Sequence, residues 1–394
     1  MKNFGLLFKR EFAIFRNNKI FLIAFLGLPL LLSLTNAFVY RKAKIRNQPI
    51  VIVDKDDSPS SRQFVQMLAD HNILNPVSEV PETIDLNQTL IKHKAVAIVV
   101  IPDYFEANLL QQRKPEVNCY LNMANTISSG AVSGAVSMCT AAMNASLISK
   151  SLQKKGIPST VSANYMAIKS NTFFEFNRGS NYLYFLWPGL IFATLHQLLL
   201  LALAISFSGE MEAGTFNYSG LLSVTDKPLL LILVKLLPYF LMSLFTIGLY
   251  FILSFIFRVP LPKHPELLLF SQLLLVIGAT LLGILYSILF PIPLKASQTL
   301  MSIATPAFTL SGFTWPVHQD PWILAAFGKI VPLTPYLRLL RMTLIQDADW
   351  AECLPQLKHQ TILIVVYLIL SWWLLASKIK KAKKQLPTNI NPTT

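Results

Sequence analysis

Long apolar runs separated by polar stretches dominate the sequence. Six runs reach or approach the about 20 residues that a helix needs to cross a bilayer. They cover residues 19–40, 183–207, 229–257, 267–290, 299–316 and 361–377. The fifth run is the weakest, because it is short and is interrupted by Pro306. The pattern predicts an α-helical polytopic membrane protein with six transmembrane helices.

Between the first two runs, residues 45–178 change to a mixed pattern of a small α/β domain. Apolar, β-branched segments at residues 49–54 and 95–101 predict strands, and weaker strands are expected at residues 117–121 and around Val77. Helices are expected near residues 61–71, 86–93 and 127–155. The acidic residues Asp54, Asp56 and Asp57 are interpreted as a helix-capping turn, because the glycine and distal glutamate of a calcium loop are missing.

The first 18 residues predict an amphipathic helix at the membrane interface. One helical face carries apolar residues, and the other carries basic and polar ones: Phe4, Leu7, Phe8, Phe12 and Phe15 against Lys2, Lys9, Arg16 and Asn17. Glu11 projects from the apolar face, where an unpaired carboxylate would be costly, so we expect it to meet a cation or backbone donors. The alternative is a helix that only anchors the chain.

Charge favours a membrane topology over nucleic-acid binding. The formal net charge is +14, but the basic residues lie beside apolar runs, as in the lead and in the tail 378–394. The excess of Lys and Arg at both ends, with an even number of spans, predicts that both termini are cytoplasmic and that the inserted domain lies outside. Arg41, Lys42, Lys44 and Arg46 run against this rule, from which long translocated domains are exempt. The amino-terminal run is interpreted as an uncleaved anchor.

A polar interruption at residues 208–227 separates the second and third runs. It predicts a short cytoplasmic helix that docks on a partner, with carboxylates favoured near a helix start and a glycine that permits close backbone approach. The residues that suggest this are Glu210, Glu212, Gly214, Thr215, Leu221 and Leu222.

Lys235 lies seven residues after Pro228, or roughly 10 Å along a helix. One interpretation is that its side chain snorkels to the cytoplasmic surface. The other is an ion pair with Glu11 or with an acidic residue of the 208–227 segment, which would link a partner's movement to the third span.

Small and polar residues within the spans allow two interpretations. Ser302, Thr305, Thr309 and Gly312 recur at near-helical spacing in the fifth run, where they mediate helix packing or line a substrate path. His196 and Gln197 in the second run pose the same choice, and interhelical hydrogen bonding is favoured over substrate handling. Residues 317–358 predict a re-entrant or interfacial segment, in which Trp315, Arg338 and Arg341 either stabilise the turn or hold lipid phosphates or an anionic substrate.

Two sets of motifs resemble the permease subunits of type-2 ABC exporters. The first is Glu210-Met-Glu212-Ala-Gly214-Thr215 with Leu221-Leu222, Thr225, Pro228 and Lys235-Leu-Leu-Pro238-Tyr239. The second is Leu310-Ser-Gly312-Phe-Thr-Trp-Pro316 with Pro321-Trp322, Pro332-Leu-Thr334-Pro-Tyr336 and Arg338 or Arg341. The span count, the cytoplasmic termini and the large domain after span one resemble the subgroup that carries such an insert.

The resemblance implies how the protein works. Residues 208–227 become the coupling helix that contacts an ATP-binding subunit, with Lys9, Arg10 and Glu11 beside it. Two permease chains, identical or similar, are implied in a bacterial inner membrane, and a periplasmic adaptor is a further possible partner. The chain has no G-x-x-x-x-G-K-[ST] loop, so we expect it to bind no cofactor directly and to leave ATP and Mg to the partner.

Two other classes of function remain open at this point. A membrane enzyme would need a cluster of acid/base or nucleophilic residues, and we find no catalytic set and no metal-ligand spacing. A receptor or scaffold using the inserted domain would leave residues 208–227 without a role. The substrate, the role of the inserted domain, and the state of Cys119, Cys139 and Cys353 are not determined by the sequence.

Overall fold

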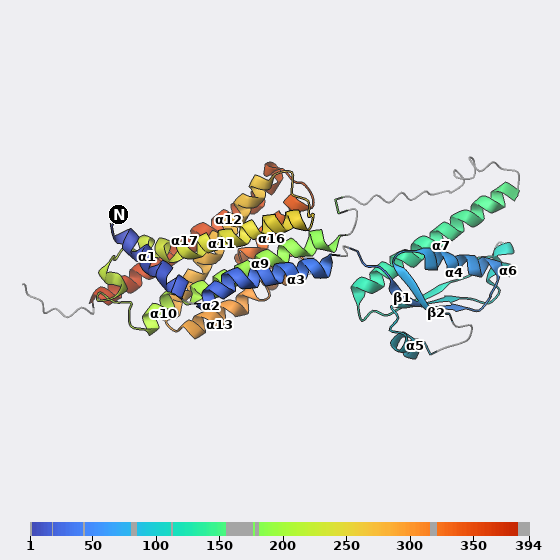
Figure 1. The fold of residues 1–394 in the computed structure, drawn as a ribbon, viewed down its shortest axis with the longest axis horizontal. Helices are drawn as coiled ribbons and strands as arrows, with labels where there is room; N and C mark the ends of the chain where they lie inside the picture. Colours follow the sequence, from blue (N-terminus) through green and yellow to red (C-terminus); the bar gives the residue numbers. More distant parts are fainter. Residues whose placement is uncertain are drawn as a thin grey trace, which may run out of the picture. The chain divides into compact units, whose positions relative to one another are not determined.

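The computed structural model describes residues 2–17, 19–41, 44–79, 85–111, 113–154, 176–177, 181–315 and 321–384. The end of the predicted inserted domain, the junction at 316–320 and the tail beyond residue 384 fall wholly or partly outside these ranges. The chain forms two compact units (Figure 1). One is a helical bundle made of Met1–Ala43 and Phe174–Thr394, and the other is an inserted domain made of Lys44–Phe173.

The bundle contains long helices joined by short turns. After α1 (Lys2–Asn17), the first span is built from α2 (Lys19–Leu22), a π-helical turn (Ile23–Gly27) and α3 (Leu28–Tyr40). The remaining elements are α9 (Tyr182–Ala204), α10 (Ser206–Glu212), a 3-10 turn (Leu221–Ser223), α11 (Pro228–Ile256), α12 (Pro265–Leu289), α13 (Pro293–Ala304), α14 (Ala307–Leu310), α15 (Trp322–Ile330), α16 (Leu333–Leu344) and α17 (Trp350–Lys384).

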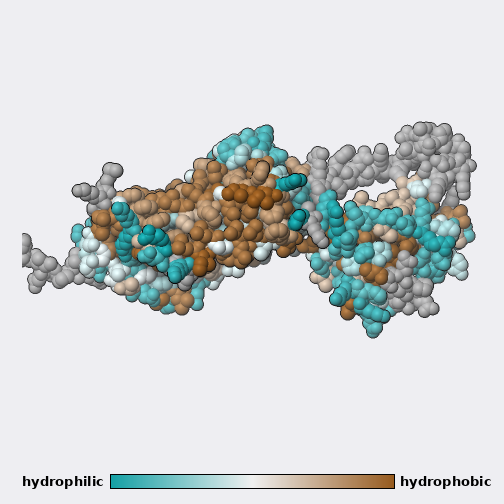
Figure 2. All heavy atoms as spheres, in the orientation of Figure 1, coloured by the Kyte–Doolittle hydropathy of each residue, from teal (hydrophilic) through white to brown (hydrophobic). Residues whose placement is uncertain are grey.

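Helices α9 and α12 form the centre of the bundle. They meet where Gly283 leaves no room for a side chain, since a Cβ there would lie 2.6 Å from the Cβ of Leu203. The apolar residues of the bundle continue to its surface, where much of the visible face is hydrophobic (Figure 2). An apolar exterior is what lipid requires of a spanning helix, whereas the inserted domain shows mainly hydrophilic residues in the same view.

Among the described residues, six helical stretches are long and apolar enough to cross a membrane. Five lie in the bundle, at Ile23–Tyr40, Tyr182–Glu212, Pro228–Ile256, Pro265–Leu289 and Trp350–Lys384. The sixth, Thr126–Ile148, belongs to the inserted domain, where Val132, Val136 and Met143 pack into the core against the sheet. The predicted fold class, a polytopic α-helical membrane protein with an inserted α/β domain, is confirmed.

The fifth predicted run is a broken helix instead of one long one. Helix α13 ends at Ala304, and α14 starts after Pro306, whose ring nitrogen has no hydrogen to donate to the preceding turn. The two helices together cover residues 293–310, beginning six residues earlier than the predicted run.

The predicted re-entrant segment contains a sharp bend. Helices α15 and α16 meet at 86°. The prediction placed the end of this segment at residue 358, but α17 already starts at Trp350, so the last span is a much longer helix than residues 361–377. The carboxylate of Glu352 accepts a hydrogen bond from the backbone N–H of Asp349 at 3.0 Å, which stabilises this earlier start.

The inserted domain is a four-stranded sheet in the order β2-β1-β3-β4. Strand β1 (Gln48–Asp54) is parallel to β2 (Leu74–Glu79) and β3 (Ala97–Ile101), and β3 is antiparallel to β4 (Asn118–Leu121). The helices are α4 (Pro59–Asp70), α5 (Leu86–Lys92), α6 (Phe105–Leu110) and α7 (Thr126–Lys154). Alternate residues of β1 feed two cores, with α4, α6 and α7 over one face and α5 over the other.

The acidic turn after β1 has the predicted capping role. The carboxylate of Asp54 accepts hydrogen bonds from the backbone N–H groups of Asp56 and Asp57 and from the hydroxyl of Ser61. Ser58 and Ser61 then form a reciprocal capping box at the start of α4. The turn is therefore part of the architecture of the domain.

Candidate functional site

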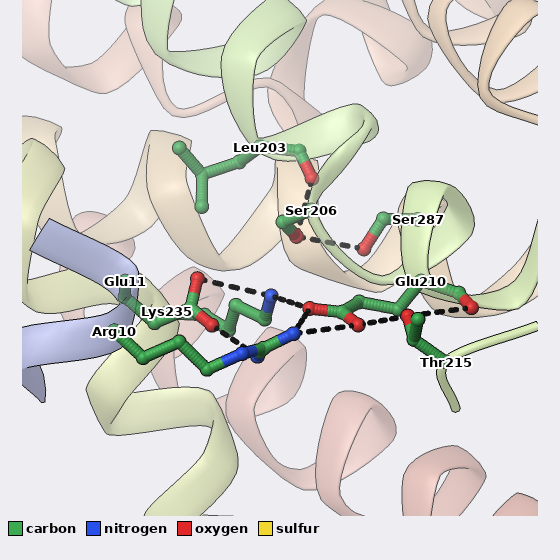
Figure 3. Close-up of polar contacts among 8 residues, drawn as sticks. All are labelled: Arg10, Glu11, Leu203, Ser206, Glu210, Thr215, Lys235 and Ser287. Carbon is green, nitrogen blue, oxygen red and sulfur yellow. Dashed lines mark hydrogen bonds and ion pairs between the residues drawn. The ribbon is translucent and has the colours of Figure 1, made fainter. Parts of the chain in front are cut away.

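Four charged side chains from three helices form a closed ring in the bundle (Figure 3). Arg10 and Glu11 come from α1, Glu210 from α10 and Lys235 from α11. The Lys235 Nζ lies 3.0 Å from Glu11 Oε2 and 3.0 Å from Glu210 Oε1. The Arg10 guanidinium lies 2.9 Å from Glu11 Oε1 and 2.7 Å from Glu210 Oε1. Each carboxylate therefore contacts both cations, and the four formal charges sum to zero.

Local helix geometry explains why these residues meet. Glu11 lies on the apolar face of α1, which packs on α11. Proline at position 228 starts α11, and Lys235 follows two turns later on a face that is buried. Glu210 lies in the last turn of α10, where a further hydrogen bond from the Thr215 hydroxyl holds its carboxylate. The ion pair expected for Glu11 is present, and Lys235 pairs with both candidate carboxylates at once.

Aromatic side chains enclose the ring. The Lys235 Nζ lies 5.6 Å from the centroid of the Phe207 ring. Next to it, Phe15 stacks edge-on against Tyr239 at 5.3 Å, and Phe25 contacts the same tyrosine at 5.7 Å. An apolar surround of this kind lowers the local dielectric constant and strengthens each ion pair relative to one in water.

The ring opens to the surface through Arg10. The side chain of Arg10 is 35% exposed, whereas those of Glu11, Glu210 and Lys235 are 5–8% exposed. Any molecule that contacts α1 from outside the bundle therefore reaches the buried charges through Arg10. Lys9 lies next to it and is exposed.

The short helix predicted for residues 208–227 covers only the start of that segment. Helix α10 ends at Glu212, and Gly214 follows with φ +68°, a backbone conformation that glycine adopts without a steric penalty. Backbone N–H groups of Thr215 and Phe216 return to the Glu210 carbonyl, and Leu221 N–H bonds to the Thr215 carbonyl. The segment is thus a helix end, a compact turn and a 3-10 turn.

The turn separates the predicted contact residues into two groups. Glu212, Gly214 and Thr215 are exposed. Leu221 and Leu222 are only 2% and 3% exposed and pack into the core of the bundle. The two leucines were predicted as partner contacts, but they are buried because the turn folds back on the helices and uses them as its own hydrophobic anchor.

The polar residues of the fifth run lie on one exposed face. Ser302, Thr305 and Thr309 are exposed, and Lys295 and Gln298 extend the same face toward the start of α13. Gly312, at φ +82°, lies beyond the end of α14 and is partly buried. We call Lys295, Gln298, Ser302, Thr305 and Thr309 the polar face of α13–α14.

The two polar residues of α9 differ in environment. His196 is fully buried, and neither ring nitrogen has a hydrogen-bond partner among the described residues. The interhelical hydrogen bond predicted for it is therefore absent from the described structure. Gln197 is partly buried.

The two arginines of α16 hold the end of α14. Arg341 donates hydrogen bonds of 2.7 Å to the carbonyl groups of Gly312 and Phe313, and its guanidinium lies 5.2 Å from the Phe313 ring centroid. Arg338 donates to the Ser311 carbonyl at 3.3 Å. These contacts match the turn-stabilising interpretation. Trp315 is 52% exposed and lies at the end of this segment.

Two polar contacts of the bundle were missed in the sequence. Lys378 of α17 contacts the Met211 sulfur at 3.2 Å, so the last span meets α10 beside the charge ring. Just before α12, His264 Nδ1 lies 2.9 Å from Glu266 Oε1, and His264 Nε2 lies 2.9 Å from Asp349 Oδ1. These hydrogen bonds raise the pKa of His264 above its ordinary value. Asp349 is 85 residues from His264 and Met211 is 167 residues from Lys378, so no local spacing signals these contacts.

Comparison with known proteins agrees with this architecture. The family model described as "ABC-2 family transporter protein" matches residues 19–373, which include the first five predicted spans, the inserted domain and most of the sixth span, but leave α1 outside. A search of curated proteins finds no matching relative. The matched range covers far more than half of the chain. The chain is therefore a multi-pass membrane permease component that belongs to the ABC-2 transporter family.

Proposed function

We propose that this permease exports its substrate with energy from a separate ATP-binding subunit, and that the charge ring couples the two. The observation that carries the proposal is the closed contact of Arg10, Glu11, Glu210 and Lys235. It ties the surface helix α1 and the α10 turn to α11, a helix long enough to span the membrane. A force on either surface element is then transmitted to a span by ion pairs as well as by packing.

The partner's surface is formed by α1 and the α10 turn. Lys9 and Arg10 supply positive charge, Glu212 supplies negative charge, and Gly214 and Thr215 leave the turn backbone accessible. Electrostatic complementarity of this mixed kind fixes the register of a docked protein more than it adds affinity. Lys378, in contact with Met211, brings the end of α17 to the same place.

The polar face of α13–α14 supports a translocation path. Exposed hydroxyl, amide and ammonium groups on a membrane helix are costly against lipid and are tolerated where they meet water or protein. We propose that a second permease chain, identical or similar, faces this surface and that the substrate passes between the two. ATP and Mg are held by the partner subunit, and the permease binds no cofactor directly.

The orientation follows from the same proposal. Because α1 and the α10 turn contact a cytoplasmic ATPase, both termini are cytoplasmic, the inserted domain lies on the outer side of a bacterial inner membrane, and a periplasmic adaptor is a possible further partner. The basic residues Lys378–Lys384 at the end of α17 fit this orientation.

The test is a purification of the tagged chain from native membranes in mild detergent, with its partners identified and ATPase activity assayed. A nucleotide-binding subunit is expected to copurify with the wild type. Glu212→Ala, which alters only an exposed residue of the turn, is expected to lose at least half of the copurified ATPase or of its coupling to transport. Glu116→Ala, an exposed glutamate of the inserted domain, is the matched control and is expected to behave as wild type.

The other classes of function predict different results. If no ATPase accompanies the chain and none restores activity on coexpression, the coupling proposal fails, and a receptor or scaffold role takes precedence. An equal loss in Glu212→Ala and Glu116→Ala would point to general instability and would also remove the support for the turn as a docking element.

A further inference from the structure

The inserted domain contains a cavity that the coupling site does not use. Its volume is about 560 Å³, within the range of roughly 300–1,000 Å³ typical of small-molecule sites. It lies between α4, α6, α7 and the segment that leads into β4, at the margin of the larger of the domain's two hydrophobic cores.

The walls of the cavity are apolar. Phe64, Phe105 and Met143 are 1–4% exposed and form part of the domain core, and Leu109 and Leu147 pack against that core. At the edge of the wall, Ile148 also lines the cavity and exposes 41% of its surface. Leu109, Leu147 and Ile148 therefore leave part of the apolar lining in water, and that cost is removed when an apolar group fills the space. The cavity therefore favours a ligand with a hydrocarbon portion.

The rim of the cavity is basic. Arg113 and Lys114 lie on the short segment before β4, and both line the cavity and are exposed. Neither forms an ion pair among the described residues, so both charges are available to a ligand. Glu116 lies two positions further along and is absent from the lining. Thr140 and Asn144 of α7 add polar groups to the otherwise apolar α7 wall.

We propose that this cavity binds a single-chain anionic amphiphile, with its hydrocarbon chain against the phenylalanine and methionine wall and its anionic head at Arg113 and Lys114. Apolar walls and a cationic rim together select against neutral lipids, which lack the head group charge, and against small hydrophilic anions, which lack the chain. The volume suits one chain better than the two chains of a phospholipid. Dodecanoate, dodecyl phosphate and similar molecules share this chemistry.

The proposal is independent of coupling, because binding to the cavity requires neither ATP nor a partner subunit. The full-length chain is reconstituted in nanodiscs of zwitterionic lipid and irradiated with a photoreactive dodecanoate analogue, and the labelled peptides are mapped. Labelling is expected within residues 105–148, with displacement by dodecanoate and dodecyl phosphate at concentrations about tenfold lower than dodecanol requires. Displacement by only one of the two anions identifies the preferred head group.

Two variants and one control make the result specific. Arg113→Glu with Lys114→Glu is expected to weaken labelling of the cavity about tenfold, and Met143→Trp is expected to abolish it by filling the space. Arg46→Glu with Lys92→Glu makes the same change of charge on exposed residues outside the cavity and is expected to leave labelling unchanged. Circular dichroism and elution volume verify that each variant is folded.

Three outcomes would overturn the proposal. Labelling confined to the membrane spans would show that the probe only partitions into the bundle and its lipid. Equal displacement by dodecanol and dodecanoate, or no effect of the rim variant, would show that the cationic rim plays no part. Absence of labelling in a folded wild type would show that the cavity is closed, whether by the chain itself or by a second copy. None of these results bears on the ATPase that copurifies with the permease.

Discussion

Lys235 lies about two helical turns inside α11, at a depth where an unpaired ammonium group is expensive. Its two carboxylate partners would be equally expensive without it, and Arg10 is the cation that balances the second negative charge. Positive and negative side chains alternate around the ring, so each residue contacts two residues of opposite charge. Removing one residue therefore affects two contacts and leaves a net charge in a poorly solvated place.

This arrangement predicts an unequal response to single and paired substitutions. Lys235→Met leaves two buried carboxylates with only Arg10, and we expect it to lower the free energy of unfolding by about 3–5 kcal/mol, the usual cost of an uncompensated buried charge. Adding Glu11→Gln restores charge balance around the Arg10–Glu210 pair, in which one guanidinium nitrogen contacts both carboxylate oxygens, and is expected to recover at least half of that loss. Denaturant unfolding of the purified chain in one detergent measures both.

Lys263→Met is the control for that comparison. Lys263 is 62% exposed and pairs with the exposed Asp349, so its replacement is expected to cost about 1 kcal/mol or less. A double variant no more stable than Lys235→Met alone would contradict the ring as a balanced unit. A simple exchange of Glu11 and Lys235 is not diagnostic, because it would place the new lysine next to Arg10 and the new glutamate next to Glu210.

At the residue level, sequence reasoning considered an ion pair of Lys235 with Glu11 or with an acidic residue of the 208–227 segment, but it predicted no pairing for Arg10 and no closed ring. The cost of an unpaired carboxylate on the apolar face of α1 predicted a partner for Glu11. Lys235 allowed two interpretations, an ion pair or a side chain that extends to the cytoplasmic surface. The contact between Arg10 and Glu210, 200 positions apart, is set by how α1 lies on α10 and α11. The sequence also did not predict that Leu221 and Leu222 are buried. Two apolar residues after a polar turn are equally compatible with a surface that docks a partner and with a contact to the protein's own core.

Helices were predicted best where a long apolar run sets their length. The ends were less predictable, because caps and tight turns depend on a few atoms. Gly214, for example, would allow another backbone to approach closely whether it lay in a helix or in a left-handed turn. In the structure it adopts the left-handed turn. Helix α17 exceeds the apolar run at both ends, because Cys353 and Leu357 pack against α12 and α16 before the run and a lysine-rich segment continues the helix after it. Pro306 was a reliable signal of the break between α13 and α14.

The contact of α9 with α12 gives a prediction at the level of whole helices. Gly283→Ala would place a Cβ 2.6 Å from the Cβ of Leu203 and 3.2 Å from the Leu200 carbonyl oxygen, so the helices must separate. We expect a loss of about 1–3 kcal/mol in the free energy of unfolding, the usual cost of overpacking. Thermal or denaturant unfolding in detergent, with one lipid composition throughout, measures the change.

Gly248 of α11 is the matched control. Apart from the local backbone of α11, no described residue lies within 4 Å of a Cβ built there, so Gly248→Ala is expected to be neutral or to stabilise by up to about 1 kcal/mol through helix propensity. Equal stability of the two variants would mean that α9 and α12 are not packed at the close distance seen here.

For the whole molecule, the division into a bundle and an inserted α/β domain was readable from the change in pattern near residue 45. Helix α7 shows where hydropathy alone is insufficient. Its composition passes the length and hydropathy test for a span, yet it packs on the sheet through one face, as its position after the β4 strand suggested. The strand order and the cavity beside α7 depend on contacts between distant segments, which a single sequence does not reveal.

The polar face of α13–α14 carries the last prediction, since a permease that works as a pair must bring such a face to water or to a second chain. Cys119, Cys139 and Cys353 are first replaced by alanine, and single cysteines are then introduced as Ser302→Cys or Thr305→Cys. A membrane-impermeant maleimide, or oxidative cross-linking to a second copy, reports on the environment. A thiol reacts as its thiolate, which water stabilises and lipid does not.

Ile369→Cys is the comparison, because Ile369 is 56% exposed on an apolar stretch of α17. We expect labelling or cross-linking at residues 302 and 305 to be about fivefold faster than at residue 369. A water-filled path or a protein interface would surround residues 302 and 305, whereas lipid would surround residue 369. Cross-linking between copies assigns the face to a homodimer. Labelling without cross-links assigns it to a water-filled path or a different partner chain. Equal, slow reaction at all three positions would place the polar face in lipid and remove it from the translocation path.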